Sequence, residues 1–244
     1  FTMSRPTCPR RRWRCKAAYH ERTASPVERI AMNPRPRRLR VLRFLPNGWL
    51  MTSGPTGAAR NLYLTFDDGP HPDHTPALLD LLAEHGAKAS FFLVGREVER
   101  HDALARRIAS EGHTLGNHSY SHPRFEALTL DEQLEEIERT QRLLTGIDGR
   151  PRRAFRTPRG VLTGARLASL VRRRHRIDYW SYDSLDYSRR PVPELLETIQ
   201  RHPPRGGDII LMHDDSEHSL TLLRALLPAW IAQGCSLRAL PHVR

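Results

Sequence analysis

The chain has 244 residues, of which 39% are hydrophobic and 27% charged, and it carries a formal net charge of +12. This composition is ordinary for a globular domain, and no apolar run approaches the roughly 18 residues that a membrane-spanning helix needs. Three cysteines, an odd number, exclude a disulfide-stapled miniprotein and a zinc site with four cysteine ligands. The basic excess lies in residues 1–60, because residues 61–244 contain 25 basic and 25 acidic side chains.

The first 60 residues are rich in arginine and proline and show no sustained helical or alternating apolar pattern. Such a segment buries too little apolar surface to offset its ordering entropy. We therefore expect residues 1–60 to be a largely disordered basic leader and residues 61–244 to be the folded domain. Methionines at positions 3, 32 and 51 are possible start sites, which raises the hypothesis that part of this leader is absent from the native protein.

The leader also bears on location and partners. Its apolar run at residues 41–46 is interrupted by Arg43 and Pro46, so it does not resemble a secretory signal. A cytoplasmic protein is expected, with export and membrane association kept as alternatives. A nucleic-acid-binding module would depend on this basic segment alone and would bind in a salt-sensitive manner. We expect no specific nucleic-acid partner.

From residue 61 onwards, predicted strands alternate with predicted helices, and four of the helices end at a glycine. Seven strands and six helices predict an α/β fold with parallel pairing, either a barrel or an open doubly wound sheet. No glycine-rich phosphate loop follows the first strand, which disfavours the nucleotide-binding sheet. The strands are residues 61–66, 89–94, 114–117, 153–156, 176–182, 208–212 and 236–239; the helices are 75–85, 98–111, 130–144, 165–174, 192–201 and 220–233; the terminating glycines are Gly86, Gly112, Gly146 and Gly234.

Polar clusters follow five of these strands. Each alone is ordinary turn chemistry, but barrel enzymes place their active residues after the carboxyl ends of several strands. Five clusters at five strand ends therefore predict one active site. In chain order the clusters read Asp67-Asp68-Gly69-Pro70, His118-Ser119-Tyr120-Ser121-His122, Arg156-Thr157-Pro158-Arg159-Gly160, Asp183-Ser184-Leu185-Asp186-Tyr187 and Leu211-Met212-His213-Asp214.

The residue types in these clusters indicate a hydrolytic metal site. One carboxylate with His118 and His122 supplies three nitrogen and oxygen ligands, and zinc in such a site lowers the pKa of its bound water to about 7. The second carboxylate of the Asp pair is then free to act as general base. His213 is a candidate general acid, whose pKa a carboxylate such as Asp186 would raise. Together these groups predict metal-assisted hydrolysis of an amide or an ester.

The motifs TFDDGP, HSYSH, RTPRG, DSLDY and LMH, in this order over residues 61–215, resemble the NodB-type polysaccharide deacetylases of carbohydrate esterase family four. The resemblance implies a distorted (β/α)7 barrel, a NodB-homology domain, as the catalytic domain of residues 61–244. It also implies removal of N-acetyl groups from N-acetylglucosamine-containing oligo- or polysaccharides, such as chitooligosaccharides or peptidoglycan-like glycans. The expected partner is thus an acetylated amino-sugar glycan.

The resemblance further implies a role for each matching position. One divalent ion, Zn²⁺ before Co²⁺, Mn²⁺ or Ni²⁺, would be held by three ligands. The general base would be held by an arginine, and a second carboxylate would tune the general acid. The implied residues are Asp67 as base, Arg156 as its partner, Asp68, His118 and His122 as metal ligands, His213 as acid, Asp186 as its tuning group, and Leu211 as the lining for the acetyl methyl.

Two positions depart from the family pattern, which usually has Tyr in place of Arg159 and Trp in place of Tyr187. The family's oxyanion contact at the first position is a backbone N–H, which Arg159 retains. The added positive charge predicts a preference for anionic glycans. Tyr187 keeps an aromatic surface but fills less space beside His213. Both residues are expected to contact substrate.

Other functions were weighed against this one. Deacylation of a lipid-linked sugar or a non-sugar amide would use the same residues. A two-histidine, one-carboxylate iron(II) oxygenase would share the ligand set, but such sites usually lie in a double-stranded β-fold, which the predicted helices disfavour. The sequence makes no prediction about the oligomeric state.

Overall fold

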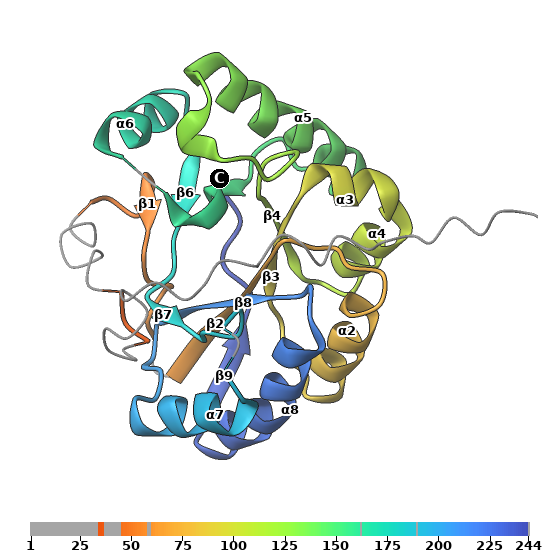
Figure 1. Ribbon diagram of the computed structural model, residues 1–244, viewed down its shortest axis with the longest axis vertical. Coiled ribbons are helices and arrows are strands. Elements are labelled where there is room, and N and C mark those ends of the chain that lie inside the picture. Colours follow the sequence, from red (N-terminus) through yellow and green to blue (C-terminus); the bar gives the residue numbers. More distant parts are fainter. Residues whose placement is uncertain (1–33, 37–44, 58–59, 162, 189, 244) are drawn as a thin grey trace, which may run out of the picture. The chain divides into compact units, whose positions relative to one another are not determined.

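The computed structural model describes residues 34–36, 45–57, 60–161, 163–188 and 190–243. In this part of the chain, nine strands form a parallel sheet with the order β1-β6-β5-β4-β3-β2-β8-β7, and β9 pairs with β2. The sheet is curled, and helices lie around its outside (Figure 1). The strands are β1 (Leu50–Met51), β2 (Arg60–Asp67), β3 (Ser90–Leu93), β4 (Thr114–Asn117), β5 (Ala154–Phe155), β6 (Arg176–Asp178), β7 (Tyr182–Asp183), β8 (Ile209–His213) and β9 (Cys235–Arg238).

The helices follow the predicted rhythm, but one predicted helix is divided in two. The predicted helix at 98–111 is divided into α3 and α4, because His101 between them has φ −130° and ψ 45°, outside the helical region. No helix among the described residues is long and apolar enough to cross a membrane. The α-helices are α2 (Thr75–Glu84), α3 (Gly95–Arg100), α4 (Asp102–Ser110), α5 (Leu130–Asp148), α6 (Gly164–Arg172), α7 (Val192–Arg201) and α8 (Glu217–Ala232).

The segment 176–183 holds the two ends of the curled sheet together. We predicted a single strand at 176–182, but the structure contains two short strands, β6 and β7, at different places in the sheet. β6 pairs with β5 and β1, whereas β7 pairs with β8. One stretch of chain therefore crosses from one end of the strand order to the other, which produces the expected distorted barrel.

The amino-terminal boundary differs from the expected one. Residues 45–57, which we assigned to the leader, include β1, whose Leu50 is fully buried and pairs with Ile177 of β6. Arg35 also forms an ion pair with Asp208. These contacts are long-range, so the local composition of the segment did not reveal them. The rest of the expected leader, residues 1–33, 37–44 and 58–59, lies outside the described residues.

Alternation along β2 decides which side chains reach the inside of the barrel. Successive side chains of a strand point to opposite faces. Leu62, Leu64 and Phe66 belong to the main hydrophobic cluster, together with residues of α2 and α8. Thr65 and Asp67 point the other way, into the barrel, where both accept hydrogen bonds from a buried arginine. Because the outer face of β2 packs against α2 and α8, the carboxylate of Asp67 points into the barrel.

The carboxyl end of α5 lies beyond the position that we predicted. We expected the helix to stop at Gly146, but it continues to Asp148, and the left-handed capping residue is Gly149 with φ +72°. Nothing lies within 4 Å of a Cβ built on Gly146. Gly146 is therefore an ordinary helical position, and its lack of a side chain only destabilises the helix.

We predict that Gly146→Ala stabilises the protein by roughly 0.5–1 kcal/mol, because alanine loses less conformational freedom in a helix than glycine does. Gly149→Ala should destabilise it by a similar amount, since alanine is disfavoured at positive φ. Urea denaturation of the two variants measures both effects. A destabilising Gly146→Ala would place the helix end at residue 146.

Candidate active site and metal centre

The predicted site residues converge at the carboxyl ends of the strands. Asp67 and His213 are register neighbours on the paired strands β2 and β8. The loops after β4, β5 and β7 bring the other groups to the same end of the barrel. The site residues and their places are Asp67 and Asp68 at the end of β2, His118 and His122 after β4, Arg156 after β5, Asp186 after β7 and His213 at the end of β8.

Three of these side chains form a cluster suited to a divalent cation. The Nε2 atoms of His118 and His122 lie 3.4 and 3.3 Å from Oδ1 of Asp68, and the ligand atoms of all three lie within 4.8 Å of one another. Metal–ligand bonds of about 2.0–2.1 Å in a tetrahedral arrangement place ligand atoms about 3.3 Å apart. Oδ1 of Asp68 is buried without a hydrogen-bond donor in the described part of the chain. This group of three thus fits a metal ion.

The protonation of these ligands also suits a cation. Nδ1 of His118 lies 2.9 Å from the carbonyl oxygen of Arg156, which fixes the proton on Nδ1 and leaves Nε2 as the free lone pair. Burial alone would raise the pKa of Asp68, but the nearby imidazoles of His118 and His122 hold it well below its usual range by charge. Asp68 is therefore a carboxylate at neutral pH.

Asp67 is held by a buried guanidinium. Arg156 is fully buried, and its NH1 group donates to Oδ1 of Asp67 at 2.7 Å and to Oγ1 of Thr65 at 2.8 Å. Its Nε donates to the carbonyl oxygen of Asp178, and its Cζ lies 3.9 Å from the centre of the Phe92 ring. The other oxygen of Asp67, Oδ2, lies 3.8 Å from Nε2 of His118. One oxygen is thus anchored, and the other faces the metal cluster.

His213 is paired with a second buried carboxylate. Oδ1 of Asp186 lies 2.9 Å from Nδ1 of His213, and Oδ2 accepts hydrogen bonds from the His213 backbone N–H and from Oγ of Ser219. Burial would lower the pKa of His213, but the charge and hydrogen bond of Asp186 raise it to about 10. His213 is therefore protonated at neutral pH, and its Nε2–H is directed away from Asp186.

The three expected substrate contacts lie around these groups. Leu211 is buried and pairs with Thr65; it lies two residues before His213, so both side chains are on the inner face of the barrel. Tyr187 is 59% exposed, and its ring stands edge-on to that of His213 with centroids 5.5 Å apart. Arg159 is exposed in the turn after β5; burial mainly lowers the pKa of His122, and the charge of Arg159 lowers it further.

Several supporting residues were absent from our sequence analysis. Thr65 lies two residues before Asp67 on the same strand face, so strand alternation was a usable signal for it. Ser219 belongs to the first turn of α8, whose amino-terminal cap is Ser216. Glu136 of α5 accepts a hydrogen bond from the backbone N–H of Tyr120, in the loop from His118 to His122. It lies too far along the chain from this loop for any local pattern to reveal the contact.

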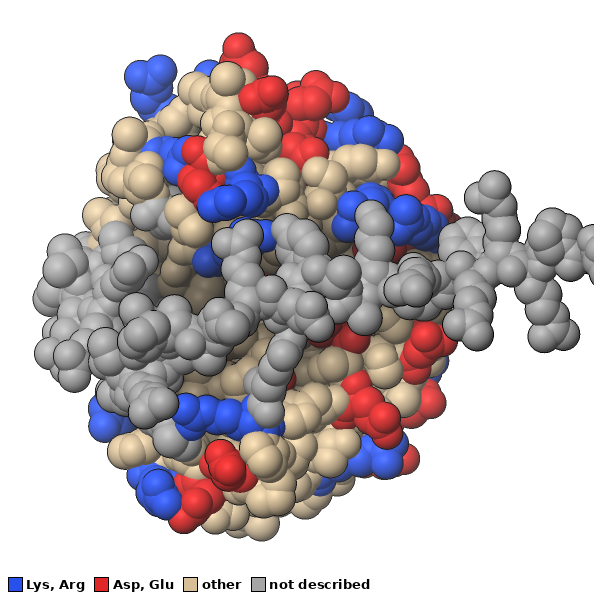
Figure 2. All heavy atoms as spheres, viewed as in Figure 1, with Lys and Arg blue, Asp and Glu red and all other residues tan. Residues whose placement is uncertain are grey.

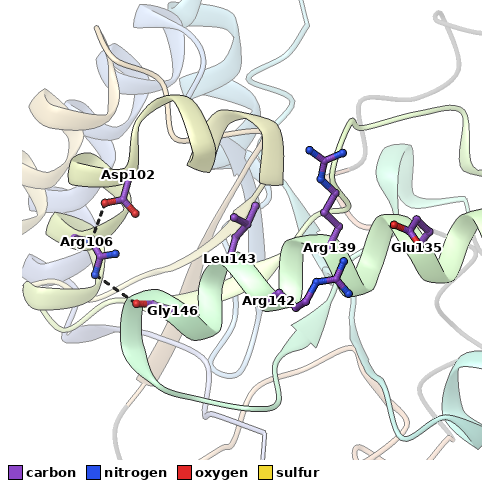
Figure 3. Close-up of a pocket in the computed structure, with 7 residues that line it drawn as sticks. All are labelled: Asp102, Arg106, Glu135, Arg139, Arg142, Leu143 and Gly146. Atoms are coloured by element: carbon purple, nitrogen blue, oxygen red, sulfur yellow. Dashed lines mark hydrogen bonds and ion pairs between the residues drawn. The ribbon is translucent and has the colours of Figure 1, made fainter.

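A separate hollow of about 610 Å³ lies on the outer surface between α4 and α5 and contains none of these groups. Figure 3 shows that Arg106 bridges Asp102 and the carbonyl oxygen of Gly146 there. Basic and acidic side chains are interspersed over the described part of the face in Figure 2.

The geometry agrees with a known family. The family model for polysaccharide deacetylase matches residues 54–201, more than half of the chain. The chain belongs to the polysaccharide deacetylase family. The match begins at residue 54, before the expected domain start at residue 61 and just after β1.

Relatives within this family have similar lengths and folds. A chitooligosaccharide deacetylase from Rhizobium leguminosarum bv. trifolii is 35% identical over 199 residues, which are 75% of this chain and 91% of that protein. A peptidoglycan-N-acetylglucosamine deacetylase from Bacillus cereus is 32% identical over 195 residues, 78% of this chain and 70% of that protein. The solved peptidoglycan deacetylase PdaC from Bacillus subtilis is 29% identical with a TM-score of 0.69, and the match covers 75% of this chain and 88% of PdaC.

A further solved structure, BA3943 from Bacillus anthracis, is described as a pseudoenzyme of carbohydrate esterase family four. It is 25% identical to this chain with a TM-score of 0.71, and the match covers 81% of this chain and 69% of that one. The deacetylase fold alone is therefore not sufficient for activity.

Proposed function

We propose that this deacetylase-family chain removes N-acetyl groups from N-acetylglucosamine-containing oligo- or polysaccharides. The observation that carries the proposal is the meeting of a metal-ligand cluster, an arginine-held carboxylate and a carboxylate-held histidine at one end of the barrel. The named activities of the relatives, on chitooligosaccharide and on peptidoglycan N-acetylglucosamine, support this substrate class.

Asp68, His118 and His122 would hold the ion. Zn²⁺ is the first candidate, because two imidazole nitrogens and one carboxylate oxygen at tetrahedral separations are a common catalytic zinc set, and Co²⁺, Mn²⁺ and Ni²⁺ are the alternatives. When bound, the ion supplies polarisation of the acetyl carbonyl and a lowered pKa for water.

Asp67 acts as the general base. Its Oδ2 faces the metal cluster, while Arg156 holds Oδ1. As water adds to the acetyl carbon, the proton leaves the water for Oδ2. The fixed position of Arg156, between Thr65 and the Asp178 carbonyl oxygen, limits rotation of the carboxylate during this transfer.

His213 acts as the general acid. Its Nδ1 is engaged by Asp186, so its Nε2 donates the proton to the nitrogen of the breaking C–N bond. The products are acetate and a free amino sugar. Asp186 keeps the imidazolium charged until this step, and Leu211 and Tyr187 line the site on either side of His213.

Acetate release tests the proposal. The metal-loaded enzyme should release acetate from N-acetylglucosamine oligomers or from peptidoglycan, and chelation should abolish the release. Asp67→Asn should lower kcat by about 100- to 10,000-fold, the range of general-base contributions. Asp73→Asn, which changes an exposed acid in the next turn, is the matched control.

Two other outcomes would change the conclusion. Release of acetate from a lipid-linked sugar or a non-sugar amide, but from none of the glycans, would overturn the substrate class and keep the chemistry. Full activity of Asp67→Asn would contradict the role of the base.

The charge of His213 predicts the pH profile. Because its pKa is raised to about 10, its acidic proton is present at neutral pH and is lost as pH rises through that value. The alkaline limb of kcat should therefore move to lower pH in Asp186→Asn, since Asp186 is the main group that raises the pKa. Asp80→Asn on the surface of α2 should leave the limb in place. If the alkaline limb of kcat stays in place in Asp186→Asn, this limb belongs to a group other than His213.

Arg159 makes the site favour anionic glycans under this proposal. It is exposed beside His122 and adds positive charge at the carboxyl end of the barrel. Arg159→Tyr should lower the ratio of kcat/KM for anionic over neutral glycans by about fivefold, the effect of one exposed charge pair worth about 1 kcal/mol. Arg152→Tyr, before β5 at the opposite end of the barrel, is the control. An equal ratio in wild type and Arg159→Tyr would contradict the preference.

A further inference from the structure

The loop that carries two of the three metal ligands has an unfavourable backbone conformation. In the segment from His118 to His122, Ser119 and His122 have φ values of +67° and +52°, although neither is a glycine. Such residues cost of order 1–3 kcal/mol each and persist only where surrounding contacts hold them. The position of the His122 imidazole therefore depends on whatever fixes this loop.

One side of the loop is held by α3. The backbone N–H groups of Gly95 and Arg96, at the start of that helix, donate to the carbonyl oxygens of Ser119 and Tyr120 at 3.0 and 2.9 Å. These bonds occupy carbonyl groups of the bent loop. Its N–H groups point elsewhere and need acceptors of their own.

A single carboxylate on α5 supplies acceptors for two of these N–H groups and for a hydroxyl of the loop, whereas the N–H groups of Ser119 and His122 are accepted by Asn117 and Ser119. Oε2 of Glu136 accepts the backbone N–H groups of Tyr120 at 2.9 Å and Ser121 at 2.7 Å, and Oε1 accepts the hydroxyl of Ser121 at 2.9 Å. The side chain is half-buried. Hydrogen bonds to an ionised acceptor are shorter and roughly twice as strong as neutral ones, so these three bonds are a strong restraint on the loop.

Glu136 is itself on a rigid support. α5 begins with a capping box in which Thr129 and Glu132 bond each other's backbone. Its Ile137 carbonyl oxygen accepts the side-chain amide of Asn117, the last residue of β4. α3 and α5 pack side by side next to the end of β4 (Figure 1). The loop is thus held between two helices that are fixed to the barrel.

We propose that Glu136 is a positioning residue that sets the metal affinity of the site by holding the loop from His118 to His122. It touches neither the ion nor the substrate. The inference shares with the proposed function only the assignment of Asp68, His118 and His122 as ligands. A glutamine at position 136 keeps one acceptor oxygen for the two backbone N–H groups, but that oxygen is uncharged, and its N–H₂ group cannot accept the Ser121 hydroxyl, so this bond survives only with its direction reversed.

Binding of Co²⁺, followed by its visible absorption in competition with a chelator, measures this effect without any turnover. Glu136→Gln should weaken Co²⁺ binding by about 10- to 100-fold, the usual cost of losing a group that supports a metal ligand. Glu135→Gln makes the same chemical change at the exposed neighbouring residue, which forms no hydrogen bond or ion pair within the described chain, and should leave the affinity unchanged.

A second variant and a second readout separate positioning from general damage. Ser121→Ala removes one of the three bonds and should give a smaller loss of affinity than Glu136→Gln. In activity assays, the metal-activation curve of Glu136→Gln should move to higher metal concentration while kcat at saturating metal stays near the wild-type value.

The proposal is overturned if Glu136→Gln binds Co²⁺ as tightly as wild type does, or if Glu135→Gln loses as much affinity. It is also overturned if the folded wild-type chain binds no Co²⁺. If the affinities differ as expected but no acetylated glycan is hydrolysed, the inference stands and the proposed function is wrong.

Discussion

The site depends first on the buried ion pair of Arg156 and Asp67. Burying either charge alone would cost several kcal/mol, and removal of one partner of such a pair typically costs about 3–5 kcal/mol. The guanidinium of Arg156 donates at once to Thr65 and Asp67 of β2 and to the carbonyl oxygen of Asp178. The backbone carbonyl oxygen of Arg156 lies 2.9 Å from Nδ1 of His118. The same residue thereby places Asp67 and His118.

Around this pair, the barrel places a second charged pair, Asp186 and His213. Arg156 holds Asp67, whereas Asp186 keeps the His213 imidazole charged against its burial. Asp67 and His213 are nevertheless register neighbours on adjacent strands. The proposed base and the proposed acid thus lie within one strand spacing, beside the cluster of Asp68, His118 and His122.

Helices on the outside of the barrel complete the site. The hydroxyl of Ser219, in the first turn of α8, donates the third hydrogen bond to the Asp186 carboxylate. Glu136 of α5 accepts three hydrogen bonds from the loop between His118 and His122. Both act one step removed from the reacting atoms. Because helices packed on a sheet are more rigid than loops, such contacts transmit the order of the core to strand-end loops that would otherwise be mobile.

Local sequence determined the rhythm of strands and helices and the five polar clusters, because turn chemistry and side-chain periodicity act over a few residues. β4 and α7 lie where the pattern placed them, and Asp68, His118 and His122, the predicted metal ligands, lie close together. Tertiary structure alone decided that residues 176–183 divide between two places in the sheet, that β1 joins it, and that Glu136 reaches the histidine loop. Each of these depends on partners distant in sequence, so no local pattern encodes it.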